Sequence, residues 1–186
     1  MIVNHDTRRT LDCVVDLLNT DLGADPGPGR DGPAVLREFV ARHGIVGIDA
    51  FGEAELAAVR AVQERFARAF DAPDDAAVAE QLNALVAGAG TTPRLTDHDG
   101  HPWHVHYFAP GASLAEHLAA DGGMALAFLL VEGERERLRR CVAPGCGRAF
   151  VDFSRNRSRR YCDGRTCGNR LHVAAYRARR REAGRD

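Results

Sequence analysis

The sequence predicts an α+β protein: a mainly helical N-terminal domain with one small β-hairpin, followed by a small treble-clef-like zinc finger. Apolar residues recur at helical spacing through most of the first 133 residues, and a short stretch near residue 100 alternates instead. Four of the five cysteines lie in two matched pairs near the C-terminal end. We therefore predict two domains, residues 1–133 and residues 134–186, in a chain long enough for one packed core and an appended module.

Composition places the chain among soluble globular proteins. Of its 186 residues, 45% are hydrophobic and 27% are charged. The longest apolar run, residues 124–131, is too short to cross a bilayer. The first twelve residues carry charges where a secretory signal needs an apolar run. We therefore expect a cytoplasmic protein.

Four amphipathic helices are predicted in the first 90 residues. They cover Thr10–Asn19, a segment from Pro33 to Gly44, Glu53–Phe70 and a segment from Pro73 to Gly88. The first is expected to be capped by Thr7 or Thr10, and the third has the clearest apolar stripe. Asn19, at the end of the first helix, is interpreted as a C-terminal cap or as a polar group that faces a ligand pocket.

A hairpin is predicted where the period changes. Two strands, Arg94–Thr96 and Trp103–Phe108, flank a turn at residues 97–100. Alternation along the second strand puts His104 and His106 on one face. Two such histidines can bind one metal, but spacing fixes no third ligand, so a solvated or partner-facing strand is the alternative.

A ligand pocket is predicted beside this hairpin. Its border would be formed by Asn19, Trp103, His104 and His106. An apolar wall with a few polar groups is typical of small-molecule sites. An exposed Asn19 with no cavity near Trp103 would contradict this prediction.

One more helix is predicted before the cysteines. Ser113 and Glu116 form a capping box, and leucines and phenylalanine follow up to about residue 130. Gly122 and Gly123 are expected to loosen or split this helix.

The cysteine spacing predicts a structural zinc site. Cys141 and Cys146 form one pair and Cys162 and Cys167 the other, with four residues inside each pair and fifteen between the pairs. Two disulfides, or small buried thiols, are the alternatives, but a reducing cytosol disfavours disulfides. Four thiolates leave no open position on one zinc ion, and no nucleophile stands at a recognisable spacing from a base. We therefore expect no enzyme activity.

Charge is segregated along the chain. Residues 134–186 hold 16 arginines and 6 acids, a net charge of +10, whereas residues 1–133 carry −11. The chain has no lysine, so part of the arginine count is a habit of composition. Segregation of charge into an acidic N-terminal part and a basic C-terminal part indicates an anionic partner for the basic part. We expect this partner to be duplex DNA.

A helix is predicted after Cys167, ending near Arg181. Asn169 and Arg170, at its start, are the candidates for reading bases, or they cap the helix and brace the finger. The residues predicted to contact nucleic acid are Arg157, Arg159, Arg160, Asn169, Arg170, Arg177, Arg180 and Arg181.

The finger resembles the CGNR zinc-finger family. The run SRNRSRRYC and the motif at Cys167–Arg170 carry the resemblance, which covers Cys141–Arg181, while LDCVVDLLNT resembles the opening of the ABATE region that precedes such fingers. Tyr161 stands where tryptophan is usual, and Leu171-His172 replaces a more basic pair. The resemblance implies a bacterial, zinc-dependent, DNA-binding regulator of transcription.

Two functions remain open on the sequence. In the first, the N-terminal domain senses a small molecule or stress and the finger binds DNA, with homodimerisation as a further hypothesis for reading two half-sites. In the second, the finger is an RNA-binding or protein-interaction module and the N-terminal domain is structural.

Overall fold

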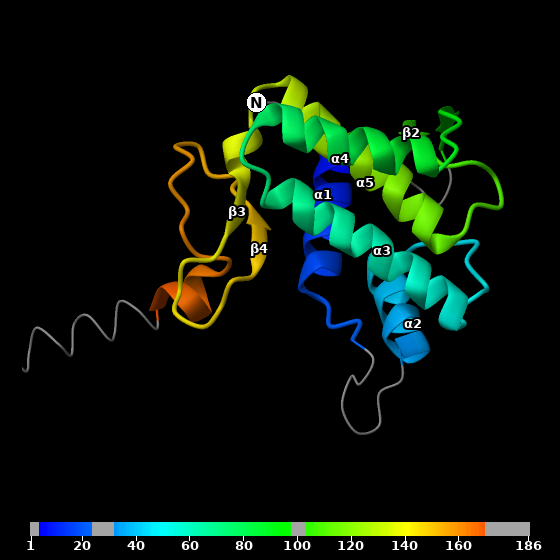
Figure 1. Cartoon of the computed structure of the whole chain (residues 1–186), viewed down its shortest axis with the longest axis horizontal. Helices are drawn as coiled ribbons and strands as arrows, with labels where there is room; N and C mark the ends of the chain where they lie inside the picture. The colour runs from blue at the N-terminus through cyan, green and yellow to red at the C-terminus, as the bar shows by residue number, and fades with distance from the viewer. Residues whose placement is uncertain (1–3, 24–31, 98–102, 170–186) are drawn as a thin grey trace, which may run out of the picture. The chain divides into compact units, whose positions relative to one another are not determined.

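The chain divides into two units, and the first is mainly helical. The computed structural model describes residues 4–23, 32–97 and 103–169, and the two units are residues 1–135 and 136–186. The first unit contains α1 (His5–Asn19), α2 (Gly32–His43), α3 (Glu53–Phe70), α4 (Asp75–Gly88), β1 (Arg94–Thr96), β2 (His104–His106) and α5 (Leu114–Val131) (Figure 1). Helix α3 has the predicted bounds. The predicted bounds of α2 and α4 differ from the observed ones by at most two residues at either end.

Helix α1 begins earlier than its apolar pattern predicts. It starts at His5 instead of Thr10, and its N-cap is Asn4, whose side-chain oxygen accepts the N–H of Thr7 at 2.7 Å. The predicted caps were therefore wrong. The Thr10 hydroxyl instead donates to the Asp6 carbonyl inside the helix, at 3.1 Å. The extra turn carries no buried residue, which is why periodicity did not reveal it.

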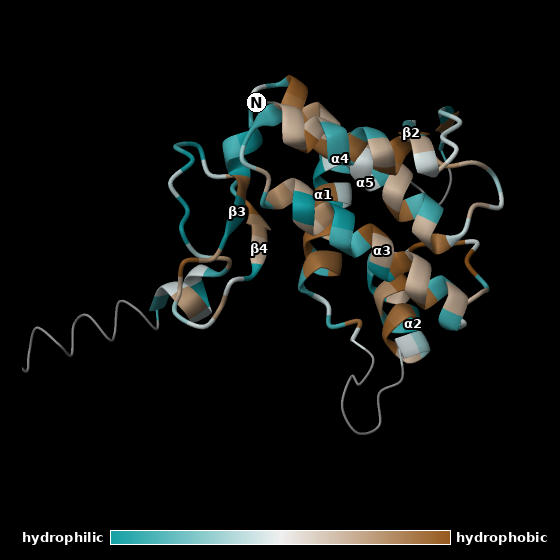
Figure 2. Ribbon diagram, in the orientation of Figure 1, coloured by the Kyte–Doolittle hydropathy of each residue, from teal (hydrophilic) through white to brown (hydrophobic). Residues whose placement is uncertain are grey.

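The core of the first unit lies among α1, α3, α4 and α5. Helix α5 packs against the other three helices. Hydrophilic residues, in teal, and hydrophobic residues, in brown, succeed one another along these helices (Figure 2). Phe66, Leu126 and Leu11 are among the largest side chains with at most 1% exposure. The Gln63 amide nitrogen donates to the carbonyls of Leu17 and Thr20, at 2.6 and 2.8 Å, which fastens the end of α1 to α3.

Helix α5 is continuous, so the prediction that its glycines split it was wrong. A Cβ on Gly122 would lie 2.6 Å from Phe66 Cζ and 2.7 Å from Val14 Cγ2. Glycine fits there because the side chains of Phe66 and Val14 approach the backbone so closely that any Cβ would force them to shift. The capping box is confirmed, since the Glu116 N–H donates to Ser113 Oγ at 3.2 Å and the Ser113 N–H to Glu116 Oε2 at 2.8 Å.

By length and composition alone, α5 could cross a membrane. It has 18 residues and a mean hydropathy of 1.4, but 56% of it is buried inside the first unit. Core helices of soluble proteins have the same properties, and α5 packs against three other helices. We therefore assign α5 to the core.

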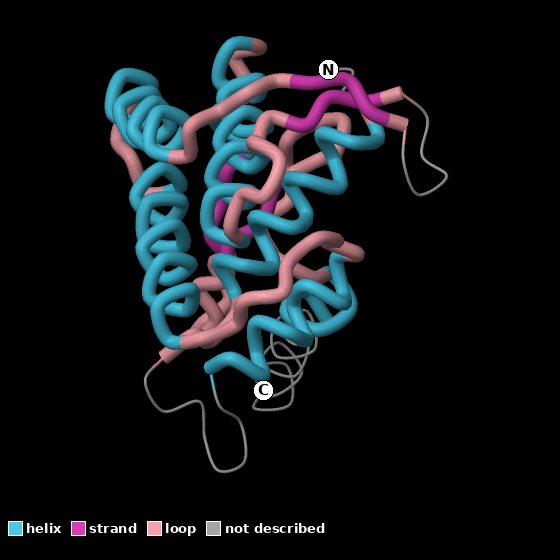
Figure 3. The backbone as a smooth tube through the Cα atoms, turned by 90° about the vertical axis from the view of Figure 1, so that its right-hand side faces the viewer, coloured by secondary structure: helices cyan, strands magenta, loops and turns pink. Residues whose placement is uncertain are grey.

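The predicted hairpin is present, with shorter strands. β1 and β2 pair antiparallel, with Leu95 opposite Val105 and Thr96 opposite His104 (Figure 3). The turn predicted at residues 97–100 lies mostly outside the described residues. Beyond β2, the Tyr107 N–H donates to Asp121 Oδ1 at 2.9 Å, so the hairpin is tied to α5.

The second unit is a small hairpin followed by a loop and a helical turn. β3 (Leu138–Arg140) pairs antiparallel with β4 (Ala149–Val151). A π-helical turn covers Gly164–Gly168. The helix predicted to continue to Arg181 falls outside the described residues after Asn169, which has helical backbone angles.

Candidate functional site

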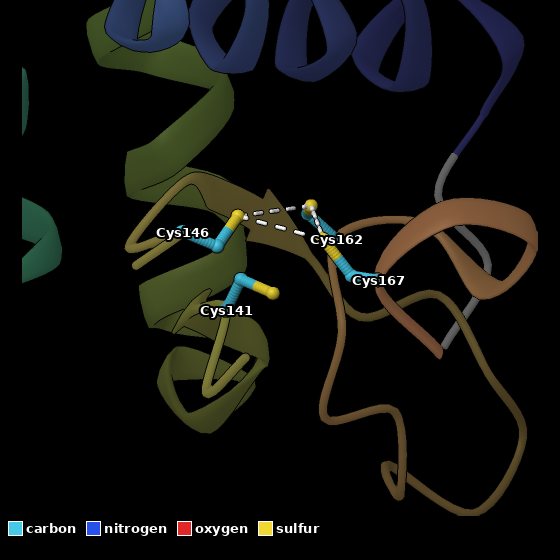
Figure 4. A group of neighbouring side chains, drawn as sticks. All are labelled: Cys141, Cys146, Cys162 and Cys167. Carbon is cyan, nitrogen blue, oxygen red and sulfur yellow. Dashed lines mark hydrogen bonds between the residues drawn. The ribbon is translucent and has the colours of Figure 1, made fainter. Parts of the chain in front are cut away.

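The four predicted ligands meet at one point in the second unit. The sulfur of Cys146 lies 3.7 Å from that of Cys162 and 3.6 Å from that of Cys167, and the last two are 3.8 Å apart (Figure 4). All four sulfurs, with that of Cys141, lie within 4.8 Å of one another. Sulfurs around a tetrahedral zinc ion, at about 2.3 Å from it, are about 3.8 Å apart. The donor set and its spacing therefore fit one zinc ion.

The first cysteine pair is positioned by a tight turn between β3 and β4. The Cys146 N–H donates to the Ala143 carbonyl at 3.0 Å, and Gly145 has a φ of 72° that favours glycine. Burial disfavours the thiolate of Cys141, but hydrogen bonds from the backbone of Cys162 and Ala143 outweigh it and lower the pKa of that thiol to about 7. Burial and the neighbouring sulfurs raise the pKa of the Cys162 thiol to about 12, so the four thiols do not share one tendency to ionise.

The second cysteine pair is positioned by the π-helical turn. Asp163 caps this turn by accepting the Arg165 N–H at 2.7 Å, and its carbonyl accepts the Gly168 N–H at 3.0 Å. Hydrogen bonding with Arg165 lowers the pKa of Asp163. The turn directs Cys167 toward the other three sulfurs (Figure 4). The disulfide alternative is not adopted, because all the cysteines are free thiols.

Two family models match the chain in agreement with this geometry. The model described as "CGNR zinc finger" matches residues 137–180, and the model described as "Putative stress-induced transcription regulator", named ABATE, matches residues 11–133. The chain belongs to the ABATE family. The resemblance inferred from the sequence is thus confirmed, and the centre is that of a CGNR finger able to hold one zinc ion. A search of curated proteins finds no match.

Asp152 organises the arginine-rich loop of the CGNR finger. Its side chain is fully buried and accepts the N–H groups of Ser154 and Arg159, both at 2.8 Å. Burial by itself would raise the pKa of Asp152. The hydrogen bonds with Ser154 and Arg159 have the larger effect, so the pKa lies below its ordinary value. The buried Arg137 side chain donates to the carbonyls of Asp152 and Ser154, at 2.7 and 2.9 Å.

Arg139 holds the far side of the same loop. Its guanidinium donates to the Arg157 carbonyl at 2.7 Å and to the Arg159 carbonyl at 3.1 Å. The sequence analysis did not assign a role to Arg137 or Arg139. Arg137 directly precedes β3, and the Asp152 N–H donates to its carbonyl at 2.8 Å, while Arg139 lies on β3 itself.

The structure separates the loop arginines predicted to contact nucleic acid. Arg157 pairs with Glu136, and Arg159 donates to the Tyr161 carbonyl at 2.8 Å while its guanidinium lies 5.2 Å from the Phe150 ring centroid. Arg160 is exposed, and within the described part of the chain no acceptor is found for its guanidinium. Arg157 and Arg159 thus have partners inside the finger, whereas Arg160 is available to an external anion.

The remaining predicted contacts lie at the end of the finger. Asn169 is exposed, and its N–H donates to the Gly164 and Thr166 carbonyls at the end of the π-helical turn. Its role as base reader or brace stays a prediction. The rest of the predicted set, Arg170, Arg177, Arg180 and Arg181, lies outside the described residues.

A pocket lies in the first unit, beside the hairpin. It has a volume of about 990 Å³, and Trp103, His104 and His106 line it as expected, whereas Asn19 is not among its lining residues. Asn19 ends α1 and is half-buried. The imidazoles of His104 and His106 are in contact, with 2.8 Å between their Nε2 atoms. Among the described residues, no third ligand joins them in a metal-binding group.

Other lining residues were missed by the sequence analysis. His117 Nε2 lies 3.4 Å from Asp121 Oδ2, and the His117 ring stacks on Phe108 with centroids 3.8 Å apart. Cys13 also lines the pocket, and burial raises the pKa of its thiol to about 12, so it is a neutral wall group. The spacing of four between His117 and Asp121 was a readable signal, since it places both on one helix face.

Proposed function

We propose that the protein is a bacterial, cytoplasmic regulator of transcription whose zinc finger binds duplex DNA. One observation carries the proposal: the zinc centre and the buried Asp152 hold a loop that leaves Arg160 exposed, in a segment with a net charge of +10. An exposed arginine can make a charge-assisted hydrogen bond to a phosphate, and a rigid loop fixes the position from which it does so. The family description, a stress-induced transcription regulator, supports the same function.

The first unit is proposed to sense a small molecule. Its pocket beside α1, α5 and the hairpin supports this role, because it combines apolar walls with a few imidazole and carboxylate groups. Binding of an effector there would regulate the DNA affinity of the finger only if the effector prefers one state of the protein.

No catalytic role is included in the proposal. Four thiolates around one zinc ion leave no position for a substrate or water, so the metal would be structural. The alternative is that the finger binds RNA or an acidic protein surface. Arginine-rich surfaces bind all three kinds of partner, so the choice requires a binding measurement.

The test is a titration of labelled duplex DNA, single-stranded DNA and RNA with the full chain, by fluorescence anisotropy at several salt concentrations. Duplex binding should weaken steeply as salt rises, because each neutralised phosphate releases counterions. Weak duplex binding that does not change with salt would assign the finger to protein interaction, and preference for RNA would assign it to RNA binding.

Homodimerisation on DNA belongs to the same proposal. A single module of this size buries on the order of 600–1,000 Å² on DNA, so two copies on neighbouring half-sites would supply useful specificity. Sedimentation of the protein with and without a duplex should give two chains per bound duplex. One chain per duplex at saturation would remove this part of the proposal.

A further inference from the structure

Most of the large apolar side chains that are exposed in the described residues gather around one hollow. Seven are exposed, and five of them line the pocket of the first unit: Val46, Leu95, Trp103, Val105 and Phe128. Trp103 and Leu95 are each 69% exposed. Single exposed apolar residues are ordinary, but a group around a cavity marks a surface that a ligand or partner covers.

The dimensions of the hollow favour a small molecule over a protein partner. Its volume of about 990 Å³ is at the upper end of the range for ligand sites, which is roughly 300–1,000 Å³. It reaches from the exposed hairpin to groups as deep as Val14 and Ala125, which are 1% and 4% exposed. A flat protein interface would not extend to the core of a helical unit.

The walls of the pocket are rich in rings. Trp103, Tyr107, Phe108 and Phe128 line it, together with the His104–His106 pair. Aromatic walls favour a flat or ring-containing apolar ligand, because stacked and edge-to-face ring contacts add to the apolar burial. An imidazole can donate through one nitrogen and accept through the other, which suits a hydroxyl or carbonyl group on the ligand.

The ionic groups of the pocket balance each other. Three carboxylates and three guanidinium groups line it, namely Asp6, Asp12, Asp121, Arg9, Arg42 and Arg94. Asp121 already accepts the Tyr107 N–H and lies beside His117, and Arg42 pairs with Asp16 at 2.6 Å. A charged ligand would therefore lose its hydration without a net opposite charge to replace it.

We infer that the pocket takes an uncharged, ring-containing apolar small molecule that carries one hydroxyl or carbonyl group. This inference rests on the proposed sensing role of the first unit, and it names the chemical class of the effector. It does not depend on the partner of the finger, because ligand binding to the pocket can be measured without nucleic acid.

The test uses the fluorescence of Trp103, the only tryptophan of the chain. Because Trp103 is 69% exposed, a ligand that covers it should shift its emission to shorter wavelength. Three probes share one apolar ring body and differ in charge: 4-tert-butylphenol, 4-tert-butylbenzoate and 4-tert-butylbenzylamine. The uncharged phenol should bind at least about tenfold more tightly than either ion, because it keeps no charge that burial would dehydrate.

A matched pair of variants on α5 locates the site. Phe128 and Val131 are both exposed and apolar, but only Phe128 lines the pocket. Phe128→Ser should weaken phenol binding about tenfold by removing a wall, whereas Val131→Ser should leave it within about twofold. Both substitutions are at exposed positions, so thermal melts should show both variants folded.

Several outcomes would overturn the inference. They are equal or tighter binding of the benzoate or the amine, equal loss in both variants, or no emission change with any probe. An emission shift that follows protein concentration without a probe would also overturn it, because a second chain would then cover the surface. If the protein did not bind DNA in a separate assay, the proposed function would be refuted, but the measured binding of the phenol to the pocket would still hold.

Discussion

Different forces stabilise the two units of the protein. In the first unit the buried set is almost entirely apolar, and Phe66, Leu11 and Leu126 are among its most buried members. In the finger only a few apolar side chains are buried around Phe150, and a buried Arg137 and a buried Asp152 lie beside them. The first unit therefore depends on burial, whereas the finger depends on metal ligation and hydrogen-bonded charges. The same perturbation should affect the two units differently.

Removal of zinc should separate the units most strongly. Structural zinc supplies about 10–16 kcal/mol of apparent binding free energy in small fingers, which is folding free energy for a segment with so small a core. Cys162→Ala should abolish the one zinc ion per chain and unfold the finger, while helical circular dichroism from the first unit persists. Metal content measured by mass spectrometry and amide NMR spectra would show both effects.

The fifth cysteine provides the control for the zinc prediction. Cys13 lies in the first unit, so Cys13→Ala should keep one zinc ion per chain and a folded finger. A finger whose amide spectrum survives chelation would show that burial, not ligation, holds it, and the contrast between the units would fail.

Close packing around α5 should be the weak point of the first unit. Gly122→Ala places a methyl group within 2.7 Å of Phe66 and Val14, and overpacking of this kind costs about 1–3 kcal/mol of unfolding free energy. Urea denaturation followed by helical signal measures it. Zinc content should not change, because the clash lies in the other unit.

A second glycine serves as the matched control for Gly122. Gly88, the last residue of α4, has no atom within 4 Å of the Cβ that alanine would add. Gly88→Ala should therefore leave stability unchanged or raise it by up to about 1 kcal/mol, through helix propensity. Equal destabilisation by both substitutions would refute the packing argument.

Asp152 is expected to stabilise the loop of the finger, as the absence of a side chain at Gly122 permits close packing in the helical unit. Asp152→Asn leaves only one oxygen for the Ser154 and Arg159 N–H groups, and an unsatisfied buried donor costs about 1–3 kcal/mol. Hydrogen exchange should accelerate at these two amides while zinc stays bound. Unchanged exchange at both would show that Arg137 and Arg139 hold the loop without the carboxylate.

Features that depend on a hydrophobic period or on the spacing of residues were predicted correctly from the sequence. The bounds of α3 follow from its apolar stripe, and the ligand set follows from two equal cysteine spacings. The start of α1 was missed because its first turn is solvated and depends on one Asn4 side chain. The glycines of α5 were misread, because their reason is the approach of Phe66 and Val14 from other helices, which no local pattern contains.

The candidate sites show the same division. Asn19 was assigned to the pocket on helix position alone, but the wall is completed by Cys13, His117 and Asp121, which come from segments that only tertiary packing brings together. Likewise, a count of arginines could not tell that Arg157 would pair with Glu136 inside the finger.

The smallest expected effect distinguishes two neighbouring arginines of the finger. Six phosphate contacts would give a log–log slope of DNA affinity against salt of roughly −5, and loss of one contact would reduce its magnitude by about one. Arg160→Ala should do this for all sequences alike, because its guanidinium is exposed and has no acceptor among the described residues. Arg157→Ala should change the slope less, because Glu136 already neutralises Arg157.

Anisotropy titrations of both variants at four or more salt concentrations measure this difference. Asn169→Ala in the same series tests base reading, since loss of a base contact should relax sequence preference while the slope stays that of the wild type. If Arg157→Ala reduced the slope as much as Arg160→Ala, the Glu136 pair would open on DNA, and the finger's internal contacts would be part of its binding surface. If neither substitution changed it, the phosphate contacts would have to come from other arginines of the finger.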